Sequence, residues 1–224
     1  MLRMIPLAAC GVLAQVLVQV LVLVLAGAAA AQTPAARVEP IPDALWRMMQ
    51  GRSWRAELPC PPRDALALLH APYRDFEGRA RMGALVVARS AAPALGSVFE
   101  ELFAADFRIA RMEPIDAFGG SDDASMAANN TSAFNCRLVE GGRGMSKHAR
   151  GLAVDVNPIQ NPYVDARGVA PPAGAPYADR RARRAPVTGM VRRDDVAVRA
   201  FRRIGWAWGG DFRVTPDYQH FYAR

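Results

Sequence analysis

Cysteine and histidine are scarce in this sequence, with three of each among 224 residues. So few cysteines exclude the dense disulfide frameworks of small secreted domains. The sequence also lacks an internal repeat, a collagen-like period and a heptad period, which excludes solenoids, collagens and coiled coils. Hydrophobic residues make up 51% of the chain, so it can bury a core and is not disordered throughout. Its length allows one domain of ordinary size.

The N-terminal segment carries no charge from Ile5 to Ala31, and one cation, Arg3, precedes that run. Alanines close the run at the positions that an A-x-A cleavage site requires. This pattern predicts a secretory signal peptide over residues 1–31, so that the rest of the chain is exported and is periplasmic or secreted. The run is also long enough to span a bilayer, so an uncleaved membrane anchor over residues 5–31 is the alternative.

Basic residues outnumber acidic ones, and the formal net charge is +7 at pH 7. A basic protein favours anionic partners such as nucleic acid, acidic lipid or an acidic cell-wall polymer. Export argues against nucleic acid, and contact with a membrane is expected only if the N-terminal segment stays as an anchor. The arginine run at 180–184 could attract acidic polymer, but such a run more often forms a solvated loop. Cys60 and Cys136 could pair in an oxidising compartment, and the sequence leaves this open.

Local patterns predict helices and strands without a regular alternation. A proline-rich linker over 32–42 precedes a single domain over 43–224. The predicted helices are 43–50, 64–70, 92–105 and 194–204. The predicted strands are 73–77, 84–89, 107–118, 152–157, 205–208 and 218–222. Two long polar stretches, 119–147 and 158–191, are predicted to be long loops, which are usually either functional or disordered. Because no regular strand–helix–strand rhythm occurs, the chain is predicted to be an α+β protein.

Two of the three histidines lie in short patterns that suit a metal site. In the predicted strand at 152–157, successive side chains point to opposite faces, so Val154 faces a core and Asp155 faces the other way. A carboxylate in mid-strand is costly unless a metal or a salt bridge binds it. His148 precedes this strand across a turn that Gly151 makes easy, so its side chain and that of Asp155 can converge.

The second pattern consists of Asp217 and His220 near the C-terminus. Their odd offset prevents both from sharing one strand face, but a turn after Pro216 would direct both side chains into one cavity. Two imidazoles and a carboxylate as ligands, with a second carboxylate as base, are the composition of a catalytic zinc site. The alternative is that the histidines are ordinary core or surface residues and that Asp155 pairs with an arginine. Residue types alone leave both interpretations open.

The exact motifs favour the first interpretation. The pattern Ser-x-His-x-x-Gly-x-Ala-x-Asp is complete, and its fixed positions are Ser146, His148, Gly151, Ala153 and Asp155. Asp217 and His220 form the downstream Asp-x-x-His, after a Trp- and Gly-rich approach at 205–212. Together these motifs resemble the zinc D-Ala-D-Ala carboxypeptidase and L-Ala-D-Glu endopeptidase family, whose superfamily includes the lysostaphin-type peptidases and the hedgehog domain. The resemblance covers roughly residues 80–224 and leaves 43–79 as an N-terminal part without such support.

The resemblance implies a small, mainly antiparallel sheet that carries the zinc site and is flanked by helices and long loops. It implies that His148, Asp155 and His220 bind one Zn²⁺. It also implies that Asp217 is the general base, which takes a proton from zinc-activated water and returns it to the leaving amine. Zinc lowers the pKa of its water to about 7, so a modestly basic carboxylate suffices for this step.

The family also uses an arginine ahead of the first motif to orient the substrate or stabilise the oxyanion. Arg137 is the predicted counterpart, and Arg111 and Arg143 are its competitors. The predicted protein is therefore an exported zinc metallopeptidase whose partner is a peptidoglycan stem peptide, cut as by a D,D-carboxypeptidase or an L-Ala-D-Glu-type endopeptidase. The alternative is a zinc-containing cell-wall-binding or signalling module of the same fold without turnover. Asp217 argues against that alternative, because a pure binding site needs no base.

Overall fold

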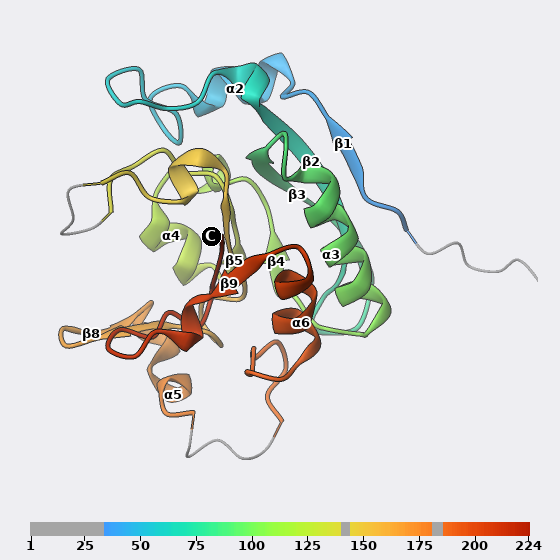
Figure 1. The fold of residues 1–224 in the computed structure, drawn as a ribbon, viewed down its shortest axis with the longest axis vertical. Helices are drawn as coiled ribbons and strands as arrows, with labels where there is room; N and C mark the ends of the chain where they lie inside the picture. Colours follow the sequence, from blue (N-terminus) through green and yellow to red (C-terminus); the bar gives the residue numbers. More distant parts are fainter. Residues whose placement is uncertain (1–33, 140–143, 181–185) are drawn as a thin grey trace, which may run out of the picture. The chain divides into compact units, whose positions relative to one another are not determined.

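Two antiparallel sheets and two longer helices surround the core in the part of the chain that the computed structural model describes, residues 34–139, 144–180 and 186–224 (Figure 1). Residues Pro34–Arg224 form one compact unit. The predicted signal peptide or anchor lies outside the described residues. Within the described ranges, no helix has both the length and the apolar character needed to cross a membrane.

The first sheet is built on a long hairpin. Strands β2 (Leu66–Arg74) and β3 (Ala80–Ala88) pair antiparallel along their full length. Strand β1 (Arg37–Glu39) lies on the other edge of β2. The first four residues of β2 are all buried, although successive side chains point to opposite faces of the sheet. This end of the hairpin is therefore covered on both faces.

Helix α3 (Ala92–Ala104) packs on this hairpin, and helix α6 (Val196–Arg203) packs beside α3. Both helices confirm the sequence-based prediction. The ring of Phe99 in α3 meets the ring of Phe201 in α6 edge-on, with centroids 6.3 Å apart. Phe201 in turn stacks on Phe221, with centroids 4.0 Å apart. Because Phe221 belongs to the second sheet, these rings join both sheets into one core.

The second sheet has three antiparallel strands, in the order β6 (Ala153–Asp155), β10 (His220–Ala223) and β9 (Trp206–Trp208). Val154 and Phe221 lie opposite each other in β6 and β10, and both are fully buried. Asp155 and His220 also lie opposite each other, one position along, and so point to the other face. The helices and these mainly antiparallel sheets confirm the predicted α+β class.

Short elements make up the rest of the described chain. The shorter helices are α2 (Asp43–Met49), α4 (Asp122–Ala127) and α5 (Ala175–Ala178). The shorter strand pairs are β4 (Arg111–Met112) with β5 (Asn130–Thr131), which is parallel, and β7 (Tyr163–Asp165) with β8 (Gly168–Ala170), which is antiparallel. Turns of 3-10 helix occur at Arg63–Ala65, Ile115–Phe118, His148–Arg150, Pro172–Gly174 and Gly209–Asp211.

Several predicted elements are wrong. Residues 64–70 form a 3-10 turn and the start of β2 rather than a helix, because a short apolar run buried on both faces of a sheet has no distinctive period. The stretch 107–118, predicted as one or two strands, contains an isolated bridge at Arg108, the two-residue strand β4 and a 3-10 turn. The stretch 119–147 is not a plain loop, since Ser121 caps helix α4 by accepting a hydrogen bond from its first turn. The stretch 158–191 likewise contains β7, β8 and α5.

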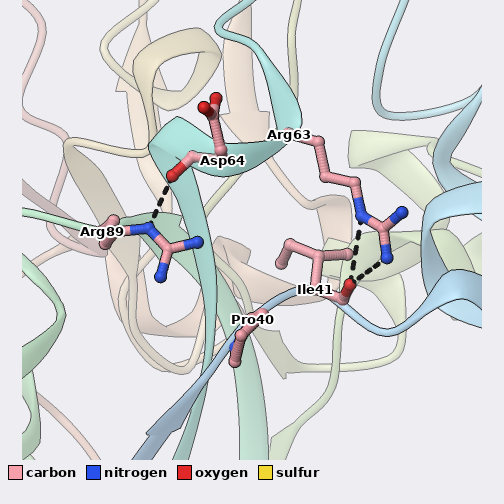
Figure 2. A pocket seen from close by; sticks show the side chains of 5 residues that line it. All are labelled: Pro40, Ile41, Arg63, Asp64 and Arg89. Carbon is pink, nitrogen blue, oxygen red and sulfur yellow. Dashed lines mark hydrogen bonds between the residues drawn. The ribbon is translucent and has the colours of Figure 1, made fainter.

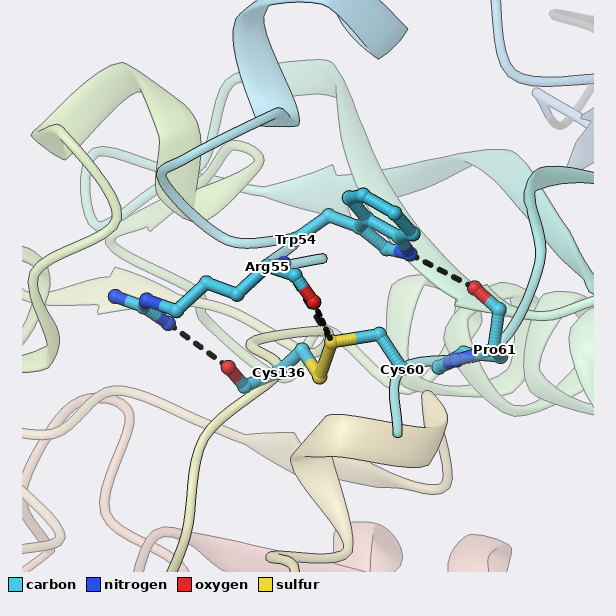
Figure 3. Close-up of a disulfide and its surroundings, with 5 residues drawn as sticks. All are labelled: Trp54, Arg55, Cys60, Pro61 and Cys136. Atoms are coloured by element: carbon cyan, nitrogen blue, oxygen red, sulfur yellow. Dashed lines mark hydrogen bonds between the residues drawn. A yellow bond between two sulfur atoms is a disulfide. The ribbon is translucent and has the colours of Figure 1, made fainter. Parts of the chain in front are cut away.

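A disulfide between Cys60 and Cys136 joins the N-terminal part of the described chain to the segment that leads to the candidate site (Figure 3). The two Cα atoms are 5.8 Å apart. Arg55 Nη1 donates a hydrogen bond to the carbonyl of Cys136 at 2.8 Å, and Trp54 Nε1 donates one to the carbonyl of Pro61 at 2.9 Å. The pairing that the sequence leaves open is therefore present in the structure.

Candidate metal and catalytic site

His148 begins a 3-10 turn that is fixed at both ends. At its start, Ser146 Oγ accepts a hydrogen bond from the main-chain amide of His148 at 3.2 Å. At its end, Gly151 has a φ of +66°, and a Cβ there would lie 2.3 Å from the amide nitrogen of Ala88 in β3. Only glycine allows this conformation and this close approach together. The turn therefore determines where β6 begins and where the His148 side chain points.

The buried ring of His148 is oriented by a main-chain carbonyl. Its Nδ1 lies 2.5 Å from the carbonyl oxygen of Ala133. Because a carbonyl oxygen only accepts, Nδ1 carries the proton in this hydrogen bond. The lone pair of a neutral ring is then on Nε2. Metal-binding histidines are oriented in this way, with one nitrogen bonded to the protein and the other directed at the ion.

Potential ligand atoms of three residues meet on the polar face of β6 and β10. His148 Nε2 lies 3.2 Å from Asp155 Oδ2 and 3.2 Å from His220 Nδ1, and His220 Nδ1 lies 2.9 Å from Asp155 Oδ1. Ligand atoms on a tetrahedral zinc ion, at bonds of about 2.0 Å, lie about 3.3 Å from one another. The observed spacing fits such an ion, and this His/Asp/His group could hold a metal.

The charges of the group explain how it is held together. Burial raises the pKa of the Asp155 carboxyl, but the charge and hydrogen bond of His148 and the hydrogen bond of His220 outweigh burial and lower it. Burial lowers the pKa of the His148 ring, but Asp155 outweighs it and raises that pKa. The group thus favours positive charge between these atoms. A divalent cation would supply that charge in place of a proton, because metals bind neutral imidazole and ionised carboxylate.

Asp217 lies beside this group at the turn that the sequence predicts after Pro216. The Asp217 carbonyl accepts a hydrogen bond from the His220 amide at 3.3 Å, and its amide donates one to the carbonyl of Gly209 at 3.1 Å. Burial raises the pKa of the Asp217 carboxyl to about 6, although the positive charge of His220 opposes the rise. Its buried Oδ1 has no hydrogen-bond partner among the described residues. A buried carboxyl oxygen without a protein donor is suited to meet a ligand or substrate.

Arg137 lies close enough to His148 for its positive charge to oppose the raised pKa of that ring. Its guanidinium forms an ion pair with Asp122, in the first turn of α4. The Arg137 carbonyl accepts a hydrogen bond from the amide of Ser146 at 3.0 Å. Asn135 Nδ2 donates to the other carboxyl oxygen of Asp122 at 3.0 Å. Arg137 therefore lies beside the site in an ion pair with Asp122, and its catalytic role stays a prediction.

The other candidates that the sequence offers are placed differently. Arg111 lies on the two-residue strand β4, and its Nε is 3.7 Å from Oε1 of Glu113. Arg143 lies outside the described residues. His70, the third histidine, lies on β2, and its Nε2 is 2.9 Å from a carboxylate oxygen of Glu39.

The sequence assigns no role in the site to three contributors: the Ala133 carbonyl, Asp122, and Gly209 within the Trp- and Gly-rich approach at 205–212. A Cβ on Gly209 would lie 2.5 Å from the Asp217 carbonyl oxygen. The absence of a side chain at Gly209 therefore lets the turn at Asp217 lie this close to it. The Gly-rich run at 205–210 is the one signal that points to such an approach. No sequence signal identifies a main-chain carbonyl or pairs Asp122 with a particular arginine.

A separate pocket of about 310 Å³ is lined by Pro40, Ile41, Arg63, Asp64 and Arg89 (Figure 2). Arg63 donates hydrogen bonds to the carbonyl of Ile41, and Arg89 donates one to the carbonyl of Asp64. None of these five residues belongs to the His/Asp/His group, so the pocket is not part of the candidate site.

Comparison with known proteins agrees with the motifs. The family model described as D-alanyl-D-alanine carboxypeptidase matches residues 140–223. This span includes His148, Asp155, Asp217 and His220, and it begins after Arg137. No curated protein and no solved structure matches the chain. The family match confirms the predicted resemblance and supports a peptidase, while the roles of the single residues stay predictions.

Proposed function

We propose that the chain is an exported, zinc-dependent peptidase that hydrolyses amide bonds in peptidoglycan stem peptides, because residues 140–223 match the family model described as D-alanyl-D-alanine carboxypeptidase and contain the possible metal group. The observation that carries the proposal is the buried Asp217 carboxyl beside a His/Asp/His group whose spacing fits a tetrahedral ion.

In the proposed enzyme, His148, Asp155 and His220 hold one zinc ion. When bound, zinc supplies Lewis acidity, which polarises the scissile carbonyl and lowers the pKa of water to about 7. The Ala133 carbonyl keeps the His148 ring in the tautomer that binds a metal. Three protein ligands leave a fourth position open, as catalytic zinc sites require.

Asp217 is the proposed general base. Its carboxylate accepts the proton of the attacking water and then donates it to the leaving amine. In the metal-free chain, burial raises the pKa of Asp217 and makes its carboxylate more basic than an ordinary one, which suits a group that accepts a proton and then passes it on. This feature favours an enzyme over a binding module of the same fold, which has no use for a buried base.

Arg137 is proposed to orient the substrate or to stabilise the developing oxyanion. Its ion pair with Asp122 means that a substrate would meet a neutral pair rather than a free cation. A D,D-carboxypeptidase must hold a terminal carboxylate, and an endopeptidase must accept chain on both sides of the bond. The products of hydrolysis distinguish these two activities.

The test is incubation of the purified chain with muropeptides, with and without a metal chelator, followed by mass spectrometry of the products. A chelator-sensitive loss of a terminal alanine indicates a carboxypeptidase, and a split stem peptide indicates an endopeptidase. His220→Ala is expected to remove both the metal and the activity. No product from folded, zinc-loaded protein would contradict the proposed function and favour a wall-binding module.

Export is proposed on two grounds. The charge-free run at 5–31 has the form of a secretory signal or an anchor. The Cys60–Cys136 disulfide suits an oxidising compartment, where such bonds persist. Cell fractionation with an antibody to the chain tests this, and recovery in the cytoplasm would contradict it.

A further inference from the structure

Arg180 opens the arginine run at 180–184, which the sequence predicts to be a solvated loop; the other arginines of the run lie outside the described residues. Arg180 instead lies over the ring of Tyr218, with its guanidinium carbon 4.1 Å from the ring centroid. Its Nη2 donates hydrogen bonds to the carbonyl of Gln160 at 3.0 Å and to Asn161 Oδ1 at 3.1 Å. Its Nη1 also donates a hydrogen bond to the carbonyl of Val191 at 3.5 Å. One guanidinium therefore contacts three segments, and two of them, at 160–161 and at 218, lead to the candidate base.

These two segments run side by side at the candidate base. Main-chain hydrogen bonds of 2.9 and 3.3 Å join residues 162–164 to residues 216–218. Between these bonds, Tyr163 and Asp217 form an antiparallel bridge. The position of the Asp217 carboxyl therefore depends on how firmly the two segments are held together.

Arg180 is better suited than an apolar side chain to hold these two segments together. Burial lowers the pKa of Arg180 to about 10, so the side chain still carries its charge at neutral pH. Burying a charge is costly unless hydrogen bonds and an aromatic face compensate. A planar guanidinium can stack on a ring with its face while donating from its edge, whereas an ammonium group cannot do both in the same way.

We propose that Arg180 is a positioning residue that clasps residues 160–164 to residues 216–218 and thereby fixes the Asp217 carboxyl beside the His148–Asp155–His220 group. The inference rests on the proposed function only where it concerns turnover. The clasp itself is a property of the chain and can be tested without activity.

The first measurement is hydrogen exchange of the metal-free protein, followed by mass spectrometry of the peptides that contain Val164 and Tyr218. The amides of these two residues form the bonds between the segments. In Arg180→Met, we expect both amides to exchange at least about tenfold faster, because local opening becomes easier. Arg199→Met is the matched control, since Arg199 donates to the carbonyl of Asp194 near its own helix, and it should leave both amides unchanged.

The second measurement is kinetic and is made on zinc-loaded protein. Arg180→Met should lower kcat per bound zinc by about 10- to 100-fold, because a misplaced base loses catalytic geometry, while KM and zinc content change little. Arg180→Lys should recover only part of kcat. A role confined to overall stability would lower the melting temperature and the folded fraction but would leave kcat per folded, zinc-loaded molecule unchanged.

The outcomes separate the clasp from the proposed function. Unchanged exchange in Arg180→Met, or an unchanged kcat at full zinc loading, would overturn the clasp. If Arg180→Met does not fold, Arg180→Lys and Tyr218→Leu provide the same test, because the first removes the planar guanidinium and the second removes the ring beneath it. If the wild-type chain is inactive but Arg180→Met still exchanges these amides faster than the wild type, the peptidase proposal is wrong and the clasp is supported.

Discussion

At the scale of single residues, Asp217 and the three predicted ligands have separable roles. Asp217→Asn keeps the size of the side chain but removes the base. We therefore expect zinc to stay at one per chain and muropeptide hydrolysis to fall by at least about 100-fold. Metal analysis and product analysis of the same sample measure both. Asp43→Asn, at an exposed carboxylate paired with Arg63, is the control and should change neither. Loss of zinc from Asp217→Asn would mean that Asp217 binds the metal.

Gly209 shapes the site because it has no side chain. A Cβ at Gly209 would lie 3.0 Å from the Cβ of Asp217 and 3.2 Å from the Cβ of His220, besides its contact with the Asp217 carbonyl. Gly209→Ala should displace both residues and weaken zinc binding by about tenfold or more, as measured by competition with a chelating dye. Gly144→Ala is the matched control, because nothing lies within 4 Å of a Cβ there. Equal zinc affinities of the two variants would refute this role of Gly209.

At the scale of elements, the β2–β3 hairpin depends on one carboxylate in its turn. Asp75 accepts hydrogen bonds from the main-chain amides of Glu77 and Arg79, and it pairs with the side chains of Arg79 and Arg81. Burial raises the pKa of Asp75, but these bonds outweigh it and lower the pKa from 3.8 to about 2. The folded state therefore favours the ionised carboxylate. Asp75 stabilises the fold above about pH 4, and this contribution is lost as the pH falls through about 2.

Asp75→Asn should accordingly lower the melting temperature at neutral pH, and the difference from the wild type should shrink between about pH 4 and about pH 2. Thermal unfolding followed by circular dichroism at a series of pH values measures this. Glu77→Gln tests a nearby exposed carboxylate that pairs with the same Arg79 and should have little effect at any pH. A difference for Asp75→Asn that does not vary with pH would show that its charge is not the stabilising feature.

The sequence predicts those elements whose pattern is local. Helix α3 has an apolar face at helical spacing, and the turn at Gly151 with the alternation of β6 suffices to bring His148 and Asp155 together. The start of β2 is mistaken for a helix because burial on both faces removes the alternation. The Ala133 carbonyl and the partner of Arg137 are unpredictable from the sequence, since both contacts depend on where a long polar stretch folds back.

At the scale of the whole molecule, the disulfide between Cys60 and Cys136 closes a loop that spans 76 positions of the sequence. Such a bridge restricts the unfolded chain, and disulfides typically stabilise a fold by about 2–4 kcal/mol. The double variant Cys60→Ser, Cys136→Ser should lose about this free energy of unfolding, as measured by urea denaturation. Reductant should destabilise the wild type similarly and leave the double variant unchanged. A wild type that does not respond to reductant would show that the bridge contributes nothing to stability.

The same double variant tests how far the N-terminal part supports the metal group. Cys136 adjoins Asn135, whose main-chain amide donates a hydrogen bond to the carbonyl of His148 at 3.2 Å. The His148 ring is oriented separately, by Ala133 and its other neighbours, so breaking the bridge should weaken zinc binding less than Gly209→Ala does. Competition with a chelating dye, under conditions where both variants stay folded, compares them. If the double variant instead loses zinc while Gly209→Ala retains it, the disulfide, and not the turn at Asp217, is the main support of the site.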